Sequence, residues 1–174
     1  MSKYLVISAL GQDKPGIVKA LSKTILDDGG NITESRMSTL GDEFALVMMV
    51  IGSEEAVLKI DASLKQLQES VGLTIICKPT SGRSLEEKRV PYHLNIVALD
   101  NPGIVHEVTD FLVGQQINVE ELSTTTYSAA HTGTMMFALD INVSLSADVN
   151  ISGFKNEFLD FCDGLNLDAT VEPV

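Results

Sequence analysis

The chain has no long hydrophobic run, although apolar residues make up 44% of its 174 positions. Its apolar stretches all fall short of the roughly 18 consecutive residues that a transmembrane helix needs. The N-terminal strand-like stretch reaches Gly11, Gln12 and Asp13 too early to contain the apolar core of a secretory signal. We therefore expect no membrane-spanning helix and a cytoplasmic location.

Cysteine and histidine are also scarce. The only cysteines are Cys77 and Cys162, which form neither a disulfide framework nor a metal-binding spacing. Both lie among apolar residues, so we expect small buried side chains rather than redox or catalytic groups. His93, His106 and His131 fall in different predicted elements, with no cysteine or carboxylate at metal-ligand spacing. The sequence predicts no metal site.

Basic residues are few, and the formal net charge is −12. Residues 91–174 contain one basic residue, Lys155, against 12 acidic residues. Lysine and arginine supply most of the affinity for a phosphate backbone, so this chain is not expected to bind nucleic acid directly. The acidic half is interpreted as a solvated surface that favours solubility.

Familiar catalytic patterns are missing as well. The sequence contains no Gly-x-Ser-x-Gly, His-Glu-x-x-His, P-loop or dinucleotide-binding fingerprint. Nothing in the chain pairs a nucleophile with a base, so we do not expect an enzyme.

The chain does contain one hexapeptide twice. Residues 13–18, Asp-Lys-Pro-Gly-Ile-Val, return 87 residues later at 100–105 as Asp-Asn-Pro-Gly-Ile-Val. The same offset places Asn31 opposite Asn118. Identities at one constant offset predict a duplicated domain.

Apolar periodicity predicts the same order of elements in each copy: strand, helix, strand, strand, helix, strand. In the first copy, strands are expected at residues 3–10, 31–40, 44–51 and 73–78. The first helix is expected to carry Pro15 in its first turn and Asp13 as its N-cap, and to end at Gly29 and Gly30. Ser53 is expected to cap the second helix.

The second copy contains two local departures from the first. An insertion around residues 142–150 is expected to lengthen its third strand or the loop that follows. Ile117 replaces Gly30 of the first copy, so its first helix is expected to end differently. Residues 81–90 are polar and charged, and are expected to link a domain at 1–80 to a domain at 91–174.

This order predicts an α+β fold made of two ferredoxin-like βαββαβ domains, each a four-stranded antiparallel sheet with two helices on one face. Such a sheet leaves an open face and two edge strands. Pairing through a sheet face or an edge is therefore expected, within one chain or in a homodimer.

The repeated turn is the predicted binding site. A turn that enters a helix presents backbone N–H groups and the positive end of the helix dipole, which suits a carboxylate. An aspartate in each turn can accept a hydrogen bond from an ammonium group, and an asparagine expected nearby can donate or accept. Helix caps, packing glycines and turn asparagines are the structural alternatives. The predicted site residues are Asp13, Gly16, Ile17, Asn31, Asp100, Asn101, Gly103, Ile104 and Asn118.

Two βαββαβ units with an Asp-x-Pro-Gly-Ile-Val turn resemble a tandem pair of ACT domains. Residues 11–18, Gly-Gln-Asp-Lys-Pro-Gly-Ile-Val, further resemble the glycine cleavage system transcriptional repressor family. The resemblance covers essentially the whole chain. It implies a non-enzymatic regulator with an amino-acid effector, glycine in this family, and no other cofactor. It also implies repression through a DNA-binding transcriptional activator protein as partner. The alternative is a regulatory subunit of an amino-acid metabolic enzyme.

Overall fold

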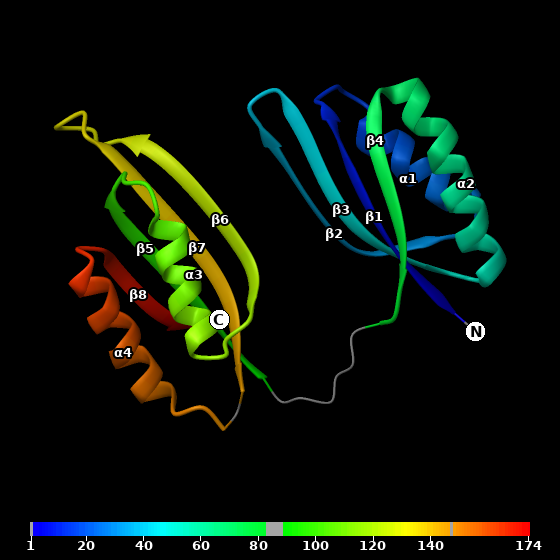
Figure 1. Cartoon of the computed structure of the whole chain (residues 1–174). Coiled ribbons are helices and arrows are strands. Elements are labelled where there is room, and N and C mark those ends of the chain that lie inside the picture. Colours follow the sequence, from blue (N-terminus) through cyan, green and yellow to red (C-terminus); the bar gives the residue numbers. More distant parts are fainter. Residues whose placement is uncertain (1, 83–88, 147) are drawn as a thin grey trace. The chain divides into compact units, whose positions relative to one another are not determined.

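The computed structural model describes residues 2–82, 89–146 and 148–174. The chain divides into two compact units, Met1–Arg83 (unit 1) and Ser84–Val174 (unit 2), each with its own sheet and helices (Figure 1). Of the stretch predicted as a linker, residues 83–88 lie outside the described part. Strand β5 begins at Arg89, inside that stretch.

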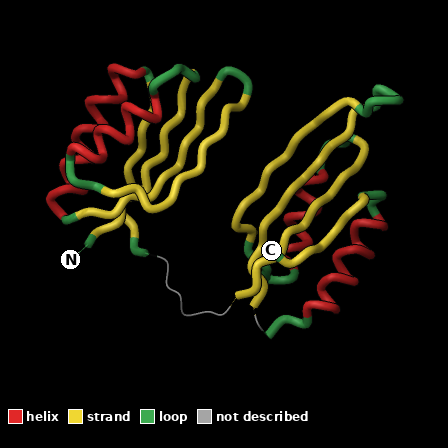
Figure 2. Tube along the Cα trace, turned by 180° about the vertical axis from the view of Figure 1, so that it is seen from behind, coloured by secondary structure: helices red, strands yellow, loops and turns green. Residues whose placement is uncertain are grey.

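Unit 1 follows the predicted order of elements. Its sheet has the strand order β2-β3-β1-β4, and neighbouring strands are antiparallel. Both helices cover one face of this sheet, and the other face is open (Figure 2). The elements are β1 (Lys3–Gln12), α1 (Ile17–Asp27), β2 (Asn31–Leu40), β3 (Glu43–Gly52), α2 (Glu54–Val71) and β4 (Leu73–Thr80).

Unit 2 repeats the plan with the order β6-β7-β5-β8. The ferredoxin-like prediction is therefore confirmed for both units. Strand β7 has 12 residues where β3 has 10, so the insertion does lengthen the third strand. The elements are β5 (Arg89–Leu99), α3 (Ile104–Gly114), β6 (Val119–Ser128), β7 (Met135–Ser146), α4 (Ile151–Gly164) and β8 (Asp168–Pro173).

The core of each unit lies between its sheet and its helices. Leu5, Ile7 and Ala9 alternate along β1, and all three are buried against the helices. In a strand, every second side chain points to the same face. This spacing therefore determines which face of β1 packs against the helices. The equivalent alternation along β5 buries Leu94 and Ile96.

The start of α1 differs from the prediction. The helix begins at Ile17, with Gly16 as its N-cap, and no side chain caps it. Pro15 therefore lies in a turn before the helix. The Asp13 N–H donates to the carbonyl oxygen of Asp42 (2.9 Å), which attaches Asp13 to the β2–β3 turn. Gly16 has φ 96°, a left-handed conformation that glycine adopts without steric cost, so the chain turns before the helix begins.

The end of α3 also differs from the prediction. Gln116 adopts φ 58° where Gly29 of unit 1 adopts φ 83°. The N–H of Ile117 donates to Leu112 O (2.9 Å), as the N–H of Gly30 donates to Ile25 O (2.8 Å). The two helices thus end in the same way, because the backbone hydrogen bonds are kept and Gln116 accepts the left-handed conformation. The prediction for α2 is confirmed: Ser53 caps it, accepting from the Ala56 N–H (3.1 Å).

Candidate functional site

The repeated turns give each unit an uncapped helix N-terminus. Gly16 and Gly103 are the N-caps of α1 and α3, with φ 96° and 102°, and neither helix start has a side-chain cap. The first N–H groups of a helix have no partner inside the helix, and they form the positive end of its dipole. Both turns therefore hold donors for an anion such as a carboxylate.

In unit 2 this turn borders a cavity of about 450 Å³. One wall is the turn itself, and the other is the end of α4 with the residues that follow it. The cavity is lined by Ala98, Leu99, Asn101, Pro102, Gly103, Ile104, Glu107, Leu165, Asn166 and Leu167. Among these, the predicted site residues Asn101, Gly103 and Ile104 are brought together.

The cavity combines donors and acceptors. Glu107 lies in the first turn of α3 and supplies a carboxylate, which the helix dipole stabilises there. Asn101 and Asn166 supply amides that both donate and accept. Together with the uncapped N–H groups, these groups complement a zwitterion, which carries a carboxylate and an ammonium group.

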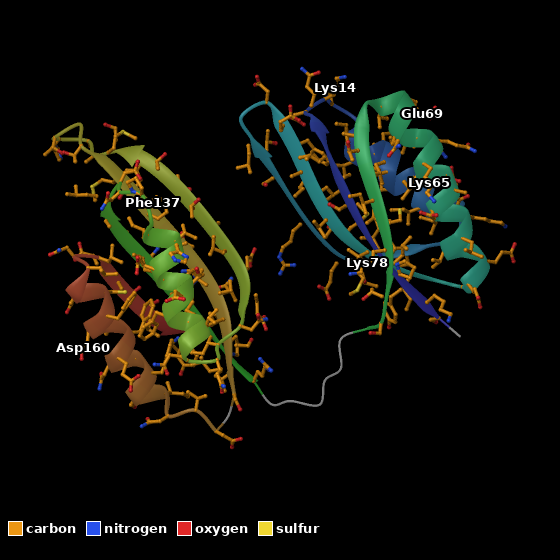
Figure 3. All side chains as sticks on the ribbon, in the orientation of Figure 1. Lys14, Lys65, Glu69, Lys78, Phe137 and Asp160 are labelled. Atoms are coloured by element: carbon orange, nitrogen blue, oxygen red, sulfur yellow. The ribbon has the colours of Figure 1, made fainter. Side chains whose placement is uncertain are left out.

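The corresponding part of unit 1 carries a different charge. Lys14 stands at the position of Asn101, near the end of β1 (Figure 3). Its Nζ lies 3.9 Å from the point where a Cβ on Gly72 would be. Gly72 occupies the position of Asn166, and both residues adopt positive φ, 73° and 56°. The Lys14 ammonium group therefore lies beside Gly72, where unit 2 has the amide of Asn166, and it favours an anion.

The remaining predicted residues of the two turns are placed as follows. Ile17 and Ile104 are buried in the cores, so the polar groups that they offer a ligand are their backbone N–H groups. Asp13 and Asp100 are exposed, and Asp100 is not part of the cavity lining. The Asp100 N–H donates to Met135 O (3.0 Å), as Asp13 does in its own unit.

Asn31 and Asn118 do not lie near the turns, contrary to the prediction. Asn31 pairs with Ile51, at the end of the sheet where β1 begins at Lys3 and Tyr4. The turn that contains Asp13 follows the other end of β1. Helix α1 carries the chain back across the sheet, so β2 starts beside the start of β1. Asn118 precedes β6 at the equivalent end of unit 2.

The polar contributors to the cavity that were not predicted are Glu107 and Asn166, the latter in the segment that follows α4. Glu107 could have been found as an acid in the first turn of a predicted helix. Asn166 could have been found by aligning the second helices of the two copies, which places it opposite Gly72. The end of α4 lies beside the repeated turn only because of tertiary packing, and no local sequence pattern predicts it.

A second polar cluster, which the sequence did not predict, lies on the open sheet face of unit 2. His93 Nδ1 lies 2.9 Å from Asn142 Oδ1, and His93 Nε2 lies 3.1 Å from Asp140 Oδ1. Asn95 Nδ2 donates to Asp140 Oδ1 (2.9 Å), and Asn142 Nδ2 donates to Glu121 Oε2 (3.0 Å). These contacts join β5, β6 and β7 through their side chains.

Cys162 is buried, as predicted, whereas Cys77 is only partly buried. Burial raises the pKa of Cys77 to about 12 and that of Cys162 to about 11. Both thiols therefore stay protonated at neutral pH. Within the described residues there is no group of His, Cys, Asp or Glu that could hold a metal ion, and no helix there is long and apolar enough to cross a membrane.

Comparison with known proteins identifies the family. Residues 3–78 match the ACT domain family. Over 171 residues the chain is 28% identical to the glycine cleavage system transcriptional repressor of Escherichia coli K12, covering 98% of this chain and 90% of that protein. A UPF0237 protein of Methanopyrus kandleri is 34% identical over 73 residues, which cover 41% of this chain and 81% of that protein.

A solved structure agrees with the sequence comparison over both units. A crystal structure assigned provisionally to the glycine cleavage system transcriptional repressors superposes with a TM-score of 0.76 at 25% identity, covering 100% of this chain and 98% of that one. The chain therefore belongs to the tandem ACT-domain family that includes the glycine cleavage system transcriptional repressors.

Proposed function

We propose that this chain is a non-enzymatic regulator that senses a small amino acid, and that this amino acid is glycine. The observation that carries the proposal is the unit 2 cavity, where an uncapped helix N-terminus, Glu107 and two asparagine amides complement a zwitterion. Similarity along nearly the whole chain to a named repressor supports the choice of glycine.

In unit 2, the carboxylate of the amino acid binds the N–H groups at the start of α3, next to Gly103. Its ammonium group binds the Glu107 carboxylate, and Asn101 and Asn166 complete the shell. Asp100 stays at the turn as an exposed second acceptor. In unit 1, Asp13, Gly16 and the Ile17 N–H group form the equivalent site, and Lys14 gives it a preference for anions. Asn31 and Asn118 take no part, because they lie at the other end of each sheet.

The regulatory output is repression of the glycine cleavage system through a protein partner. A net charge of −12 opposes binding to DNA, so a DNA-binding transcriptional activator makes the contact with the operator. The protein acts in the cytoplasm. Open sheet faces and edges allow it to form a homodimer as well.

Isothermal titration calorimetry with glycine, serine and alanine tests the sensing step. We expect saturable binding with glycine the tightest, and a loss of about tenfold or more in affinity for Glu107→Gln, because a charge-assisted hydrogen bond is removed. Asp13→Ala should leave the affinity of the unit 2 cavity for glycine unchanged. If no amino acid binds at millimolar concentration, the sensing proposal is wrong.

The regulatory step is tested separately. In a strain that lacks the gene, expression of the glycine cleavage genes should stop responding to glycine supply, and the wild-type gene should restore the response. Affinity capture from the native cell extract should recover a DNA-binding protein. Recovery of a metabolic enzyme together with unchanged gene expression would favour the regulatory-subunit alternative.

A further inference from the structure

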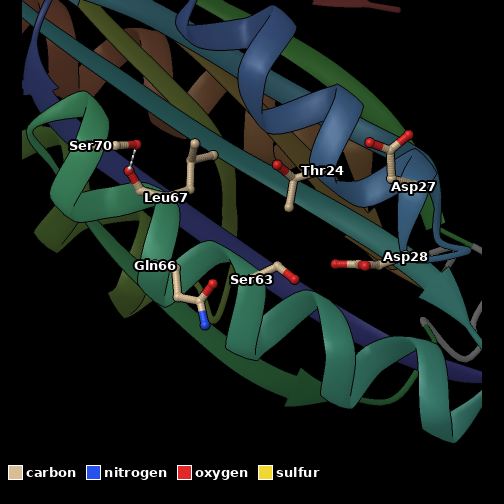
Figure 4. A pocket seen from close by; sticks show the side chains of 7 residues that line it. All are labelled: Thr24, Asp27, Asp28, Ser63, Gln66, Leu67 and Ser70. Carbon is tan, nitrogen blue, oxygen red and sulfur yellow. Dashed lines mark hydrogen bonds between the residues drawn. The ribbon is translucent and has the colours of Figure 1, made fainter.

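Unit 1 has a polar groove of about 370 Å³ between its two helices (Figure 4). The groove lies at the end of α1, so it shares no residue with the turn at residues 13–17. It is lined by Thr24, Asp27, Asp28, Ser63, Gln66, Leu67 and Ser70.

The groove is rich in hydrogen-bond acceptors. The Thr24 hydroxyl donates to Ala20 O (3.0 Å) and the Ser70 hydroxyl donates to Leu67 O (2.8 Å), so both present lone pairs to the groove. Asp28 Oδ2 is buried and has no hydrogen bond within the described residues. Figure 4 shows the Asp28 carboxylate directed toward α2, on the side of Ser63. Buried polar atoms are usually hydrogen-bonded, so we expect this oxygen to accept a hydrogen bond from a bound ligand.

The electrostatics of the groove favour a cation. Asp28 is the C-cap of α1, where the helix dipole is negative. Asp27 is already paired with Lys23 (2.6 Å). Lys59 is held by Glu55 (2.8 Å). The pKa of Lys59 is raised mainly by that hydrogen bond, and only in small part by the charge of Asp28.

In unit 2 the same space is filled. Phe111 and Phe161, which stand at the positions of Thr24 and Leu67, stack with their ring centroids 4.6 Å apart. Gln115, at the position of Asp28, donates through Nε2 to Glu157 Oε2 (3.0 Å). The fold therefore does not require an open groove between these helices, and its opening is particular to unit 1.

We propose that the unit 1 groove binds a small aliphatic ammonium compound without a carboxylate. Its ammonium group donates to Asp28 and to the hydroxyl oxygen of Thr24, which lies one helical turn before Asp28. Its methylene chain lies against Leu67. A carboxylate is disfavoured by the like charges of Asp27 and Asp28. This site is separate from the proposed amino-acid site and does not depend on it.

The test is an NMR titration of the intact chain with 1,4-diaminobutane, and with 1,4-butanediol as a neutral probe of the same length. We expect saturable shifts around the groove with the diamine and none with the diol. Asp28→Asn should weaken binding about tenfold or more, since a hydrogen bond to a charged group is lost. Asp61→Asn is the matched control, because Asp61 carries the same charge but pairs with Lys65 (2.6 Å) on α2 and does not line the groove. It should leave the affinity unchanged.

A second variant closes the groove. Thr24→Phe with Leu67→Phe introduces the aromatic pair of unit 2 and should abolish the shifts while the protein stays folded by circular dichroism. If this variant fails to fold, the Asp28→Asn titration decides alone. The proposal is overturned if wild type shows no saturable shift, or if Asp28→Asn binds as well as wild type. It is also overturned if Asp61→Asn weakens binding equally, because the attraction would then be a general effect of charge.

Discussion

The two units have one backbone plan, but they differ in how the space beside their helices is used. In unit 2, Phe111 and Phe161 stack between α3 and α4. In unit 1, Thr24 and Leu67 leave a polar groove at the same place. At the repeated turn the units differ in charge, because the unit 2 cavity is lined by the amides of Asn101 and Asn166, whereas unit 1 has the Lys14 ammonium group beside Gly72. The duplicated fold therefore supports two sites of different chemistry.

The open sheet faces differ in the same way. Unit 1 presents apolar side chains on this face, with Val47 51% and Ile76 63% exposed. Unit 2 presents the linked polar groups of His93, Asp140 and Asn142. A polar face with satisfied hydrogen bonds is stable in contact with water. An exposed apolar face is typical of surfaces that contact another molecule. The two open faces therefore differ in chemistry although they occupy the same place in the fold.

The largest expected effect concerns the third residue after each of α1 and α3, Gly30 and Ile117. Ile117 is buried in unit 2, so Ile117→Gly should lower the free energy of unfolding by about 2–5 kcal/mol through the cavity it leaves. The reciprocal Gly30→Ile should also destabilise, since a Cβ there would lie 2.5 Å from Ile60 Cδ1 and 2.8 Å from Val50 Cγ1. Urea unfolding followed by circular dichroism measures both. A neutral result for either variant would show that the two cores are interchangeable at this point.

A smaller effect is expected at the open face of unit 2. Asp140→Ala removes the acceptor of Asn95 and His93, and should cost about 1–3 kcal/mol. The matched change on unit 1, Val47→Ser, should stay within about 0.5 kcal/mol, because Val47 is half exposed and makes no such bonds. Equal losses in thermal unfolding would contradict the distinction between the two faces.

The turn glycines should behave alike. Gly16→Ala and Gly103→Ala place a side chain at φ 96° and 102°, and nothing lies within 4 Å of either new Cβ. Each should therefore cost about 1–2 kcal/mol from backbone strain alone. Calorimetric melting of both variants measures the two costs. A marked difference between them would mean that the turns are not equivalent.

The smallest effect concerns pH. The folded-state pKa values of Cys77 and Cys162, about 12 and 11, lie above the ordinary value of 9.0. The unfolded thiols therefore lose protons first, and stability falls as pH rises from about 9 toward these values. Cys162→Ala should flatten this decline over the range from 9.0 to about 11. Urea midpoints measured across this range provide the test, and an unchanged slope would contradict it.

Much of the architecture could be predicted from local patterns. Alternation along residues 3–10 and the 3 and 4 spacing along residues 57–71 each specify an element and its buried face. The predictions that were wrong concern where α1 begins, how α3 ends and where Asn31 lies. They depend on backbone φ angles and on the direction in which α1 crosses the sheet. Gly16 turns the chain before the helix begins, and Gln116 adopts the left-handed conformation that Gly29 adopts in unit 1, so α3 ends as α1 does. Asn31 lies away from the turn because α1 carries the chain back across the sheet before β2 begins.

The site was predicted in part for the same reason. Asn101, Gly103 and Ile104 lie in one turn, so a motif is enough to group them. Glu107 and Asn166 come from α3 and the end of α4, and only the packed fold brings them to that turn. The unit 1 groove was not foreseen at all, because Thr24 and Asp28 face Ser63 and Leu67 only once α1 lies beside α2.

The sequence by itself determined the duplication, the order of elements and the buried faces, because these depend on periodicity within short segments. Only the tertiary structure decided which end of each helix meets which turn, and hence where the cavity and the groove lie. Their contents depend on residues that are distant in the chain, and each pair of helices had to pack before a difference such as Thr24 against Phe111 could leave a space open or fill it.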